Sequence, residues 1–486
     1  MHSSGLFSFG TLRLGLIGIL LACGACGGSS HHEHIAGKAG AAPVPQTQAV
    51  PPLSADDVSL LFPAPTLAED FAKLIAVRDL TTQNTQDPTK RDPVWSDAAF
   101  QQFLGIAGGP AAQVAGTQIQ IGLPVEVQSK GVWFIAGIRI DAGAPGLSTD
   151  IREQFGQLPQ IRLIVQPVTQ NPDGTPHVHD IAGHLIFNFV LPKLNDPAQP
   201  DCLQRPMPDL NAFNAIVRDL AAIRTKLSDG QLGTNKVTTS GVPLGVHPGL
   251  ADATTTMNLR LEMKSFLESH ISGQRLGAMA IAGLPTGAHA PWIFLSMLGV
   301  PPGAVSALPN GGFIPVRGPT LDGQQFAQML EPVGTLPRVV PEPRTNNLSA
   351  ISCKNGAVSP TSLPIARRSG VSTSKLFITP PPPVDSTKEI LDVIADPAKS
   401  HFFNTDCVSC HTETRRSMEL LNIKDIPGID PAALPNGPWD VRNFGWSPAP
   451  KGAIQATVTR RTAAETAAVV SFINSELLAK QASANH

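Results

Sequence analysis

Alternating apolar and polar residues predict strands across the first half of the chain. The predicted strands are Thr117–Gln128, Val132–Ile140, Gln160–Val168 and Ile181–Val190. This alternation is typical of strands that bury one face. The last two strands are joined through Asn171-Pro-Asp-Gly174, a sequence favoured in tight turns, and are therefore expected to form an antiparallel hairpin.

Further apolar runs predict a second hairpin and several helices. The hairpin joins Arg275–Gly283 to Trp292–Leu298. Helical spacing of apolar residues predicts helices at Leu67–Ala76, Ala98–Ile106, Asp209–Leu227 and Met257–His270. Residues 55–378 are therefore predicted to be a β-rich α+β region, with room for two subdomains, and they resemble no family that we can name.

A polyproline segment at 379–384 marks the end of this region, since such a segment is stiff and serves as a spacer. After it, Ser386-Thr-Lys-Glu389 and Thr462-Ala-Ala-Glu465 have the spacing of helix capping boxes. The second box precedes a stripe formed by Val469, Ile473 and Leu477. Residues 385–480 are therefore expected to form a small all-α domain.

Five residues inside this segment, Cys407-Val-Ser-Cys410-His411, have the spacing at which proteins attach a c-type haem. Two thiols one helical turn apart can reach the vinyl groups on one edge of a porphyrin, and His411 then presents its imidazole to the iron. A thioredoxin-like pair or half of a zinc site is disfavoured, because a His follows at once and no second Cys pair lies downstream. The motif predicts one covalent haem c with His411 as the proximal ligand.

With this motif between two capped helices, residues 385–480 resemble the compact monohaem cytochrome c domain. In that family the first and last helices cross and close the haem pocket. The resemblance implies single-electron transfer through one haem. The predicted fold class is therefore multidomain, with a β-rich α+β central region followed by a small all-α cytochrome c-like domain.

The second iron ligand is the point at which the sequence departs from this family. The family usually places a Met on a loop well after the haem motif, whereas the only downstream Met here is Met418, seven residues past His411. An extended stretch of that length spans about 23 Å, enough to pass a ring edge. His401 is a second candidate, and a core role for Met418 stays open.

The segment from Trp439 to Trp446, where the ligand is expected, contains neither Met nor His. Trp446 and its neighbours are interpreted as an apolar lid over the haem, with Asn443 or water on the distal side. Arg415 and Arg416 suit hydrogen bonds to haem propionates, because a guanidinium binds carboxylates bidentately. Two arginines on a solvated turn are the alternative.

The N-terminus predicts export. Arg13 precedes a short apolar run that ends at Ala22-Cys23, and residues 1–22 resemble a bacterial lipoprotein signal peptide. The resemblance implies that Cys23 is acylated, although Leu21 is larger than the usual residue and an ordinary secretory signal stays open. Residues 23–54 are predicted to be a flexible tether that includes the cluster His31-His-Glu-His34. The expected location is the bacterial cell envelope, on the periplasmic side or the surface, with the outer membrane favoured.

Six Cys agree with an oxidising compartment. Two belong to the signal region and two to the haem motif, which leaves Cys202 and Cys353 as one pair. Such a pair is predicted to be a structural disulfide, with two separate buried thiols as the alternative.

Composition excludes one class of partner. A net charge of -2 with 15% charged residues provides no basic surface for nucleic acid. A cluster formed by His177 and His179, with His184 nearby, has metal-like spacing, because His177 and His179 would face the same side of a strand. No third ligand is identifiable, and polar surface is the alternative. The expected partners are the membrane, through the lipid anchor, and a redox protein of the envelope.

Three functions follow from these features. The preferred one is a lipid-anchored c-type cytochrome that transfers single electrons and is not itself an enzyme. A haem enzyme or a gas- or peroxide-binding protein with an open distal site is the second. The third is an envelope-binding module with an accessory haem.

Overall fold

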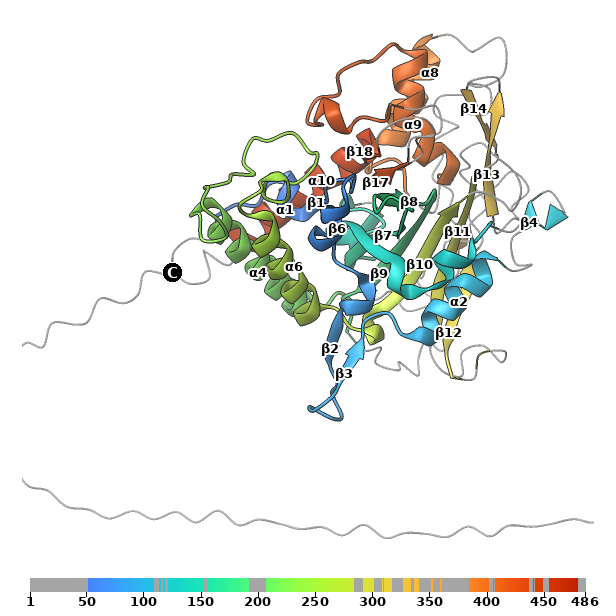
Figure 1. Ribbon diagram of the computed structural model, residues 1–486. Helices are drawn as coiled ribbons and strands as arrows, with labels where there is room; N and C mark the ends of the chain where they lie inside the picture. Colours follow the sequence, from blue (N-terminus) through green and yellow to red (C-terminus); the bar gives the residue numbers. More distant parts are fainter. Residues whose placement is uncertain are drawn as a thin grey trace, which may run out of the picture. The chain divides into compact units, whose positions relative to one another are not determined.

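The computed structural model describes most of the chain from residue 51 to residue 479 (Figure 1). Residues inside this range that are not described are 109–112, 115–116, 119–120, 150, 153–155, 192–206, 284–291, 301–307, 309, 317–326, 334–335, 341–350, 353–358, 361–383, 402–404, 406, 437–439, 441 and 449–453. The predictions for Cys23, Cys202 and Cys353, for residues 23–50 of the tether and for residues 379–383 lie outside the described residues. The tether prediction is wrong at its end, because Leu53 is 3% exposed and its backbone is hydrogen-bonded to the Asn474 side chain. All described residues belong to the unit Ala49–His486.

Among the described residues, ten strands form one antiparallel sheet. They are β1 (Ser59–Leu61), β6 (Trp133–Ala144), β7 (Leu158–Gln170), β8 (Pro176–Val178), β9 (Ile181–Asn188), β10 (Leu276–Gly283), β11 (Trp292–Val300), β12 (Gly312–Val316), β13 (Ala327–Val333) and β14 (Leu336–Val340). The strand order is β1-β6-β7-β9-β10-β11-β13-β14, with β8 beside β7 and β12 beside β11. The β-rich α+β prediction for this region is confirmed.

Both predicted hairpins are present. The chain turns at Asn171 after β7, where the N–H of Gly174 donates to the Asn171 carbonyl at 2.9 Å and Gly174 has a φ of 88°. Such a positive φ favours glycine. β10 pairs with β11 as expected from the alternation in residues 275–298.

The predicted strand at residues 117–128 is wrong for most of its length. Among the described residues of this range, only β5 (Thr117–Gln118) is a strand, paired with β4 (Gln113–Val114). The chain then forms the 3-10 turn η3 (Val125–Gln128), in which the N–H of Val127 donates to the Pro124 carbonyl at 3.1 Å. Pro124 has no N–H to offer a neighbouring strand, which ends the ladder.

One face of the sheet is apolar and is called the α2 face here. A row of residues stands opposite one another on five neighbouring strands: Ile138, Leu163, Leu185, Met279 and Met297. Each is at most 1% exposed. The helix α2 (Asp97–Ala107) packs beside them through Phe103, whose ring meets Trp133 at 5.5 Å between centroids. Burial of this row stabilises the sheet.

Other helices appear near their predicted positions. Those confirmed are α2, α4 (Leu210–Ser228) and α6 (Thr256–His270), with the short α1 (Ala55–Val58) and α5 (Pro248–Ala251) in addition. Shorter elements are η1 (Ala68–Lys73), η2 (Val77–Asp79), η4 (Lys130–Val132), η5 (Gly273–Arg275), and the strand pairs β2 (Thr81–Gln83) with β3 (Arg91–Pro93) and β15 (Ile351–Ser352) with β16 (Ser359–Pro360). No helix in the described part of the chain has the length and apolarity that a membrane crossing requires.

The predicted helix at residues 67–76 is replaced by η1. The Asp70 carboxylate accepts hydrogen bonds from the N–H groups of Thr66 and Leu67, both at 2.8 Å, and so fixes a short turn. Further on, the Ile75 carbonyl accepts from the N–H of Ile135 at 2.9 Å, beside the sheet. This partner is not available to a continuous helix, so the apolar side chains at 74 and 75 are buried from an extended backbone.

The C-terminal segment is not purely helical, so the all-α prediction is not confirmed. It contains α8 (Val384–Ala395), α9 (Cys407–Leu420), η8 (Pro431–Ala433), β17 (Phe444–Ser447), β18 (Gln455–Val458), α10 (Arg460–Phe472) and the π-helical turn η9 (Ile473–Leu478). β17 and β18 pair as a two-stranded sheet. Residues on α10 and β17 belong to the same hydrophobic core as the large sheet.

The start of the last helix differs from its predicted capping box. Thr459 is the N-cap of α10, and its hydroxyl accepts from the N–H of Thr462 at 3.4 Å. The Thr462 hydroxyl instead donates to the Asn443 carbonyl at 2.9 Å. Thr462 is therefore inside the helix, and Glu465 is free for another role.

Two adjacent carboxylates lie buried in α1. Asp57 accepts from Thr239 at 2.9 Å and pairs with Arg224 at 3.2 Å. Asp56 is 0% exposed, and its Oδ2 has no hydrogen-bond partner among the described residues. Burial raises the pKa of Asp56 from about 3.8 to about 8. The folded protein therefore holds a proton on Asp56 at neutral pH.

Replacing Asp56 with Asn is expected to stabilise the protein as the pH rises. Between about pH 4 and about pH 8 the folded chain keeps this proton and the unfolded chain does not, so native stability falls across that window. The free energy of unfolding of Asp56→Asn, relative to the native protein, should increase by about 1 to 4 kcal/mol from pH 5 to pH 8. Urea denaturation at each pH measures this difference.

The matched control is Asp425→Asn, because Asp425 is exposed. Its difference from the native protein should stay constant over the same range. A constant difference for Asp56→Asn as well would contradict a protonated Asp56.

Candidate functional site

The helix α9 begins with the Cys-x-x-Cys-His motif. Cys410 lies one turn into the helix, and its Sγ accepts a hydrogen bond from Nδ2 of Asn443 at 3.8 Å. Burial raises the pKa of the Cys410 thiol to about 11. A thiol with so high a pKa is protonated at neutral pH, which argues against a reactive redox cysteine.

His411 is held against the large sheet. Its ring lies 4.8 Å from the ring of Phe294 on β11, with an angle of 48° between the two planes. Phe294 is 4% exposed, and α9 also packs against β13 and β14. The imidazole is therefore positioned by an aromatic side chain from another part of the chain.

The sheet face beneath this segment is called the α10 face here. One row across it comprises Gly137, Ile164, His184, Ala280 and Ser296, which stand opposite one another on neighbouring strands. A Cβ added at Gly137 would lie 2.7 Å from the ring of Phe444 on β17, so the C-terminal segment covers this row at one end. Apart from Ile164, this row carries small or polar residues where the α2 face carries large apolar ones.

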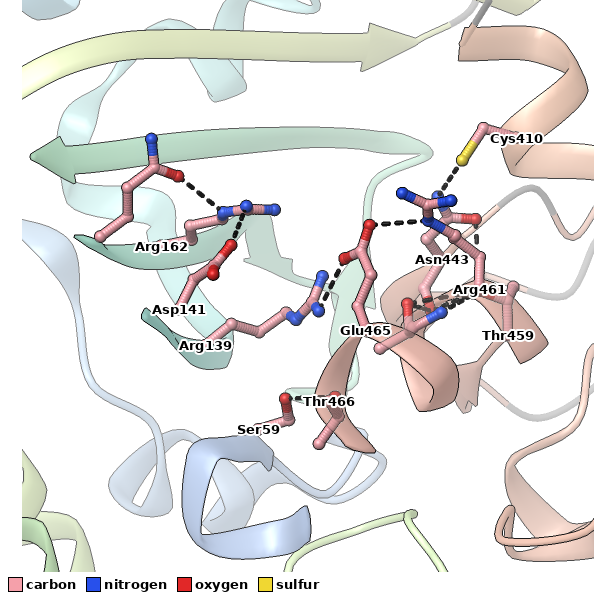
Figure 2. A network of polar contacts seen from close by, with 12 residues as sticks. Ser59, Arg139, Asp141, Arg162, Cys410, Asn443, Thr459, Arg461, Glu465 and Thr466 are labelled. Carbon is pink, nitrogen blue, oxygen red and sulfur yellow. Dashed lines mark hydrogen bonds and ion pairs between the residues drawn. The ribbon is translucent and has the colours of Figure 1, made fainter. Parts of the chain in front are cut away.

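A buried ion-pair network joins this face to α10 (Figure 2). Glu465 lies between two guanidinium groups, accepting from Arg139 on β6 at 2.8 Å and from Arg461 at 2.7 Å. Arg162 on β7 pairs with Asp141. Burial alone would raise the pKa of Glu465, but the charges of Arg461 and Arg139 outweigh it and hold the pKa well below its usual value.

Arg460 links the three C-terminal helices. It pairs with Asp392 on α8 and with Glu413 on α9, the latter at 2.9 Å. Its N–H also donates to the Thr414 hydroxyl at 2.8 Å. Glu413 is 0% exposed, and burial raises its pKa. These contacts fix the helix that carries the motif relative to α8 and α10.

The two predicted propionate ligands lie further along α9. Arg415 forms an ion pair with Glu419 on the same helix. Arg416 is 2% exposed, and burial lowers its pKa to about 10. A role for either residue at a propionate stays a prediction.

The two candidate distal ligands differ in their setting. Met418 lies on the continuous helix α9, about 10 Å along the axis from His411 and on a similar face. This helix replaces the extended stretch on which the Met418 hypothesis depends. His401 is 3% exposed, and burial together with the charge of Arg461 lowers its pKa to about 3.

Trp446 is a core residue instead of the predicted lid. It is 0% exposed, and its indole N–H donates to the Phe62 carbonyl at 2.9 Å. Its backbone also pairs with the side chain of Gln166 on β7. Asn443, expected on the distal side, contacts Cys410.

The histidine cluster is only partly assembled. His177 and His179 lie on one side as expected, with ring centroids 4.5 Å apart, and His179 hydrogen-bonds the Thr169 hydroxyl at 2.8 Å. His184 lies on the α10 face instead. Within the described ranges, no three His, Cys, Asp or Glu side chains come together as a metal site.

Sequence reasoning missed Phe294, Arg139 and Glu465 as site residues. Phe294 was visible only as one position of an apolar strand, and Glu465 only as part of a capping box. Comparison with known proteins adds no analogy, because no family model, curated protein or solved structure matches the chain.

Replacing Glu465 with Gln is expected to destabilise the folded protein by about 3 kcal/mol, because two guanidinium groups would stay buried without their shared carboxylate. The contribution of Glu465 is present above its unfolded pKa of about 4.3 and is lost as the pH falls below it. Urea denaturation at pH 7 and at pH 4 measures both effects.

Glu389→Gln serves as the control, since Glu389 is exposed on α8. Its stability should match that of the native protein. Equal stability of Glu465→Gln and the control at pH 7 would show that the network does not hold α10 to the sheet.

Proposed function

We propose that the chain is a c-type cytochrome that transfers single electrons through one covalently attached haem. The observation that carries this proposal is the Cys407–His411 motif at the start of a helix packed against a sheet, with His411 resting on Phe294.

The residues around the motif suit this cofactor. Cys407 and Cys410 would hold the haem covalently, and His411 would bind its iron. The bound iron would take up and release one electron. Phe294 limits the rotation of His411, and Asn443 donates a hydrogen bond to the Cys410 sulfur.

The charge of the buried network also suits a haem. Among the described residues, Arg139, Arg162 and Arg461 share two carboxylates, those of Glu465 and Asp141, as Figure 2 shows, and their other partners are neutral: Arg162 also donates to the Gln160 side chain and Arg461 to the Ile394 carbonyl. Buried positive charge is stable only when it is paired. The propionates of a nearby haem would provide anionic partners, because guanidinium groups bind carboxylates well.

Export and anchoring belong to the same proposal. The resemblance of residues 1–22 to a lipoprotein signal supports acylation at Cys23 and attachment to the outer membrane of a bacterial envelope. Covalent haem attachment takes place outside the cytoplasm in such cells, which agrees with an exported chain. The proposed partner is a redox protein of the envelope.

Replacing both Cys407 and Cys410 with Ala is expected to abolish covalent haem. The native protein, produced with a c-type maturation system, should keep its haem after denaturation and show a c-type haemochrome spectrum. The double variant should lose all haem on a denaturing gel. Cys202→Ala with Cys353→Ala is the matched control and should keep it. A c-type spectrum from the Cys407 and Cys410 variant would refute the proposal.

Replacing Cys23 with Ser is expected to release the protein from the membrane. Without an acylated Cys the chain has no lipid anchor, so the mature protein should move to the soluble periplasmic fraction. Fractionation followed by immunoblotting measures this. Cys26→Ser should stay with the membrane, and equal behaviour of the two variants would count against anchoring at Cys23.

A further inference from the structure

A haem held by His411 has a second axial position, and the haem-bearing helix does not fill it. α9 is continuous from Cys407 to Leu420, so Met418 lies further along the same face of the helix as His411 and would not reach the opposite side of a haem bound there. A residue on the opposite side must come from the surface that faces α9. That surface is the α10 face of the sheet, on which Phe294 contacts His411.

Strand register decides which iron-binding side chains lie on this face. Met279 and Met297 are in the apolar row of the α2 face and are 1% exposed. His179 lies just after β8, and its ring forms a hydrogen bond with the Thr169 hydroxyl. His184 is opposite Ile164 and Ala280 in the row of the α10 face. Among the described strands of the sheet, His184 is therefore the imidazole on the face that meets the haem motif.

The opposite orientation of its neighbour supports this placement. A Cβ added at Gly183 would lie 3.1 Å from Phe103 and 3.4 Å from Trp133, on the α2 side. Since successive residues of a strand point to opposite faces, the His184 side chain points to the α10 face.

His184 and Phe294 lie close together on that face. Phe294 is opposite Ala282, and His184 is opposite Ala280, two residues further along β10. Two strand spacings and two residues separate the two backbone positions by about 12 Å. Between them β10 presents only the methyl groups of Ala280 and Ala282, so no large side chain of this strand separates His184 from the Phe294–His411 pair.

The His184 ring has no competing polar interaction among the described residues. It is half-buried, and in the part of the chain that the structure describes no hydrogen bond or ion pair involves its nitrogens. Burial lowers the pKa of His184 to about 3, and positive charge on His411 adds to that effect.

We propose that His184 is the second axial ligand of the haem, provided from the sheet. This inference rests on the proposed function. The haem would then be bound by two histidines, one from α9 and one from β9, and would lie where the C-terminal segment meets the sheet. Because both axial positions would be occupied, the iron would be low-spin and suited to electron transfer and not to gas binding.

The experiment compares the native holoprotein with His184→Ala and His401→Ala. His401 is the matched control because it is a buried histidine closer to the motif in sequence. All three proteins should keep covalent haem on a denaturing gel. The native protein and His401→Ala should be low-spin by electron paramagnetic resonance and should not bind carbon monoxide when reduced. His184→Ala should become high-spin and bind it, and added imidazole should restore the low-spin signal.

Two outcomes would overturn the assignment. One is a native low-spin signal in His184→Ala, and the other is conversion to high spin in His401→Ala alone. Absence of covalent haem from the native protein would instead refute the proposed function. If His184→Ala does not fold, His184→Met provides the test: a low-spin iron with sulfur ligation and a raised reduction potential supports His184, and an unchanged spectrum refutes it.

Discussion

The fold depends on covering a sheet face that carries charge. Arg139 and Arg162 stand opposite each other on β6 and β7, and like charges placed together cannot be buried without counter-charges. Asp141 forms an ion pair with Arg162 within the sheet, but the partner of Arg139 is Glu465, more than three hundred residues later in the sequence. The C-terminal helix is therefore held to this face by electrostatics as well as by apolar packing.

This constraint explains why the haem motif lies beside the sheet. Glu465 places α10, Arg460 ties α10 to α8 and α9, and α9 carries the motif. The turn η9, which directly follows α10, is fastened to the start of the described chain, because Asn474 exchanges two hydrogen bonds of 2.9 Å with the backbone of Leu53. A change in any one of these contacts would move the others.

The elements that sequence predicts well are those decided by near neighbours. The alternation in β6, β7 and β9 and the turn at Asn171–Gly174 are local signals, and these elements are present as expected. The errors arise where a distant partner decides the local structure. The backbone at Ile75 is extended because its carbonyl accepts a hydrogen bond from the N–H of Ile135. Trp446 is buried because its backbone N–H donates to the Gln166 side chain and its indole N–H donates to the Phe62 carbonyl.

The candidate site shows the same division. The motif formed by Cys407, Cys410 and His411 is recognised from spacing alone, because three residues within five positions need no fold to bring them together. His184 was visible only as part of a polar hairpin end. Its position opposite Ala280, in the row beside Phe294, depends on the register of three strands, which no short pattern in the sequence specifies.

The hydrogen bond between Leu53 and Asn474 joins residues that are 421 positions apart in the sequence. This separation affects the order in which parts of the chain fold during synthesis. Contacts so distant in sequence form late, because the closing loop must include almost the whole protein. An exported chain that emerges from its N-terminus would therefore expose the charged sheet face until α10 arrives. The motif on α9 emerges before α10. Under the proposed function, the enzymes that attach the haem would therefore reach its thiols while the face is still open, and closure would follow modification.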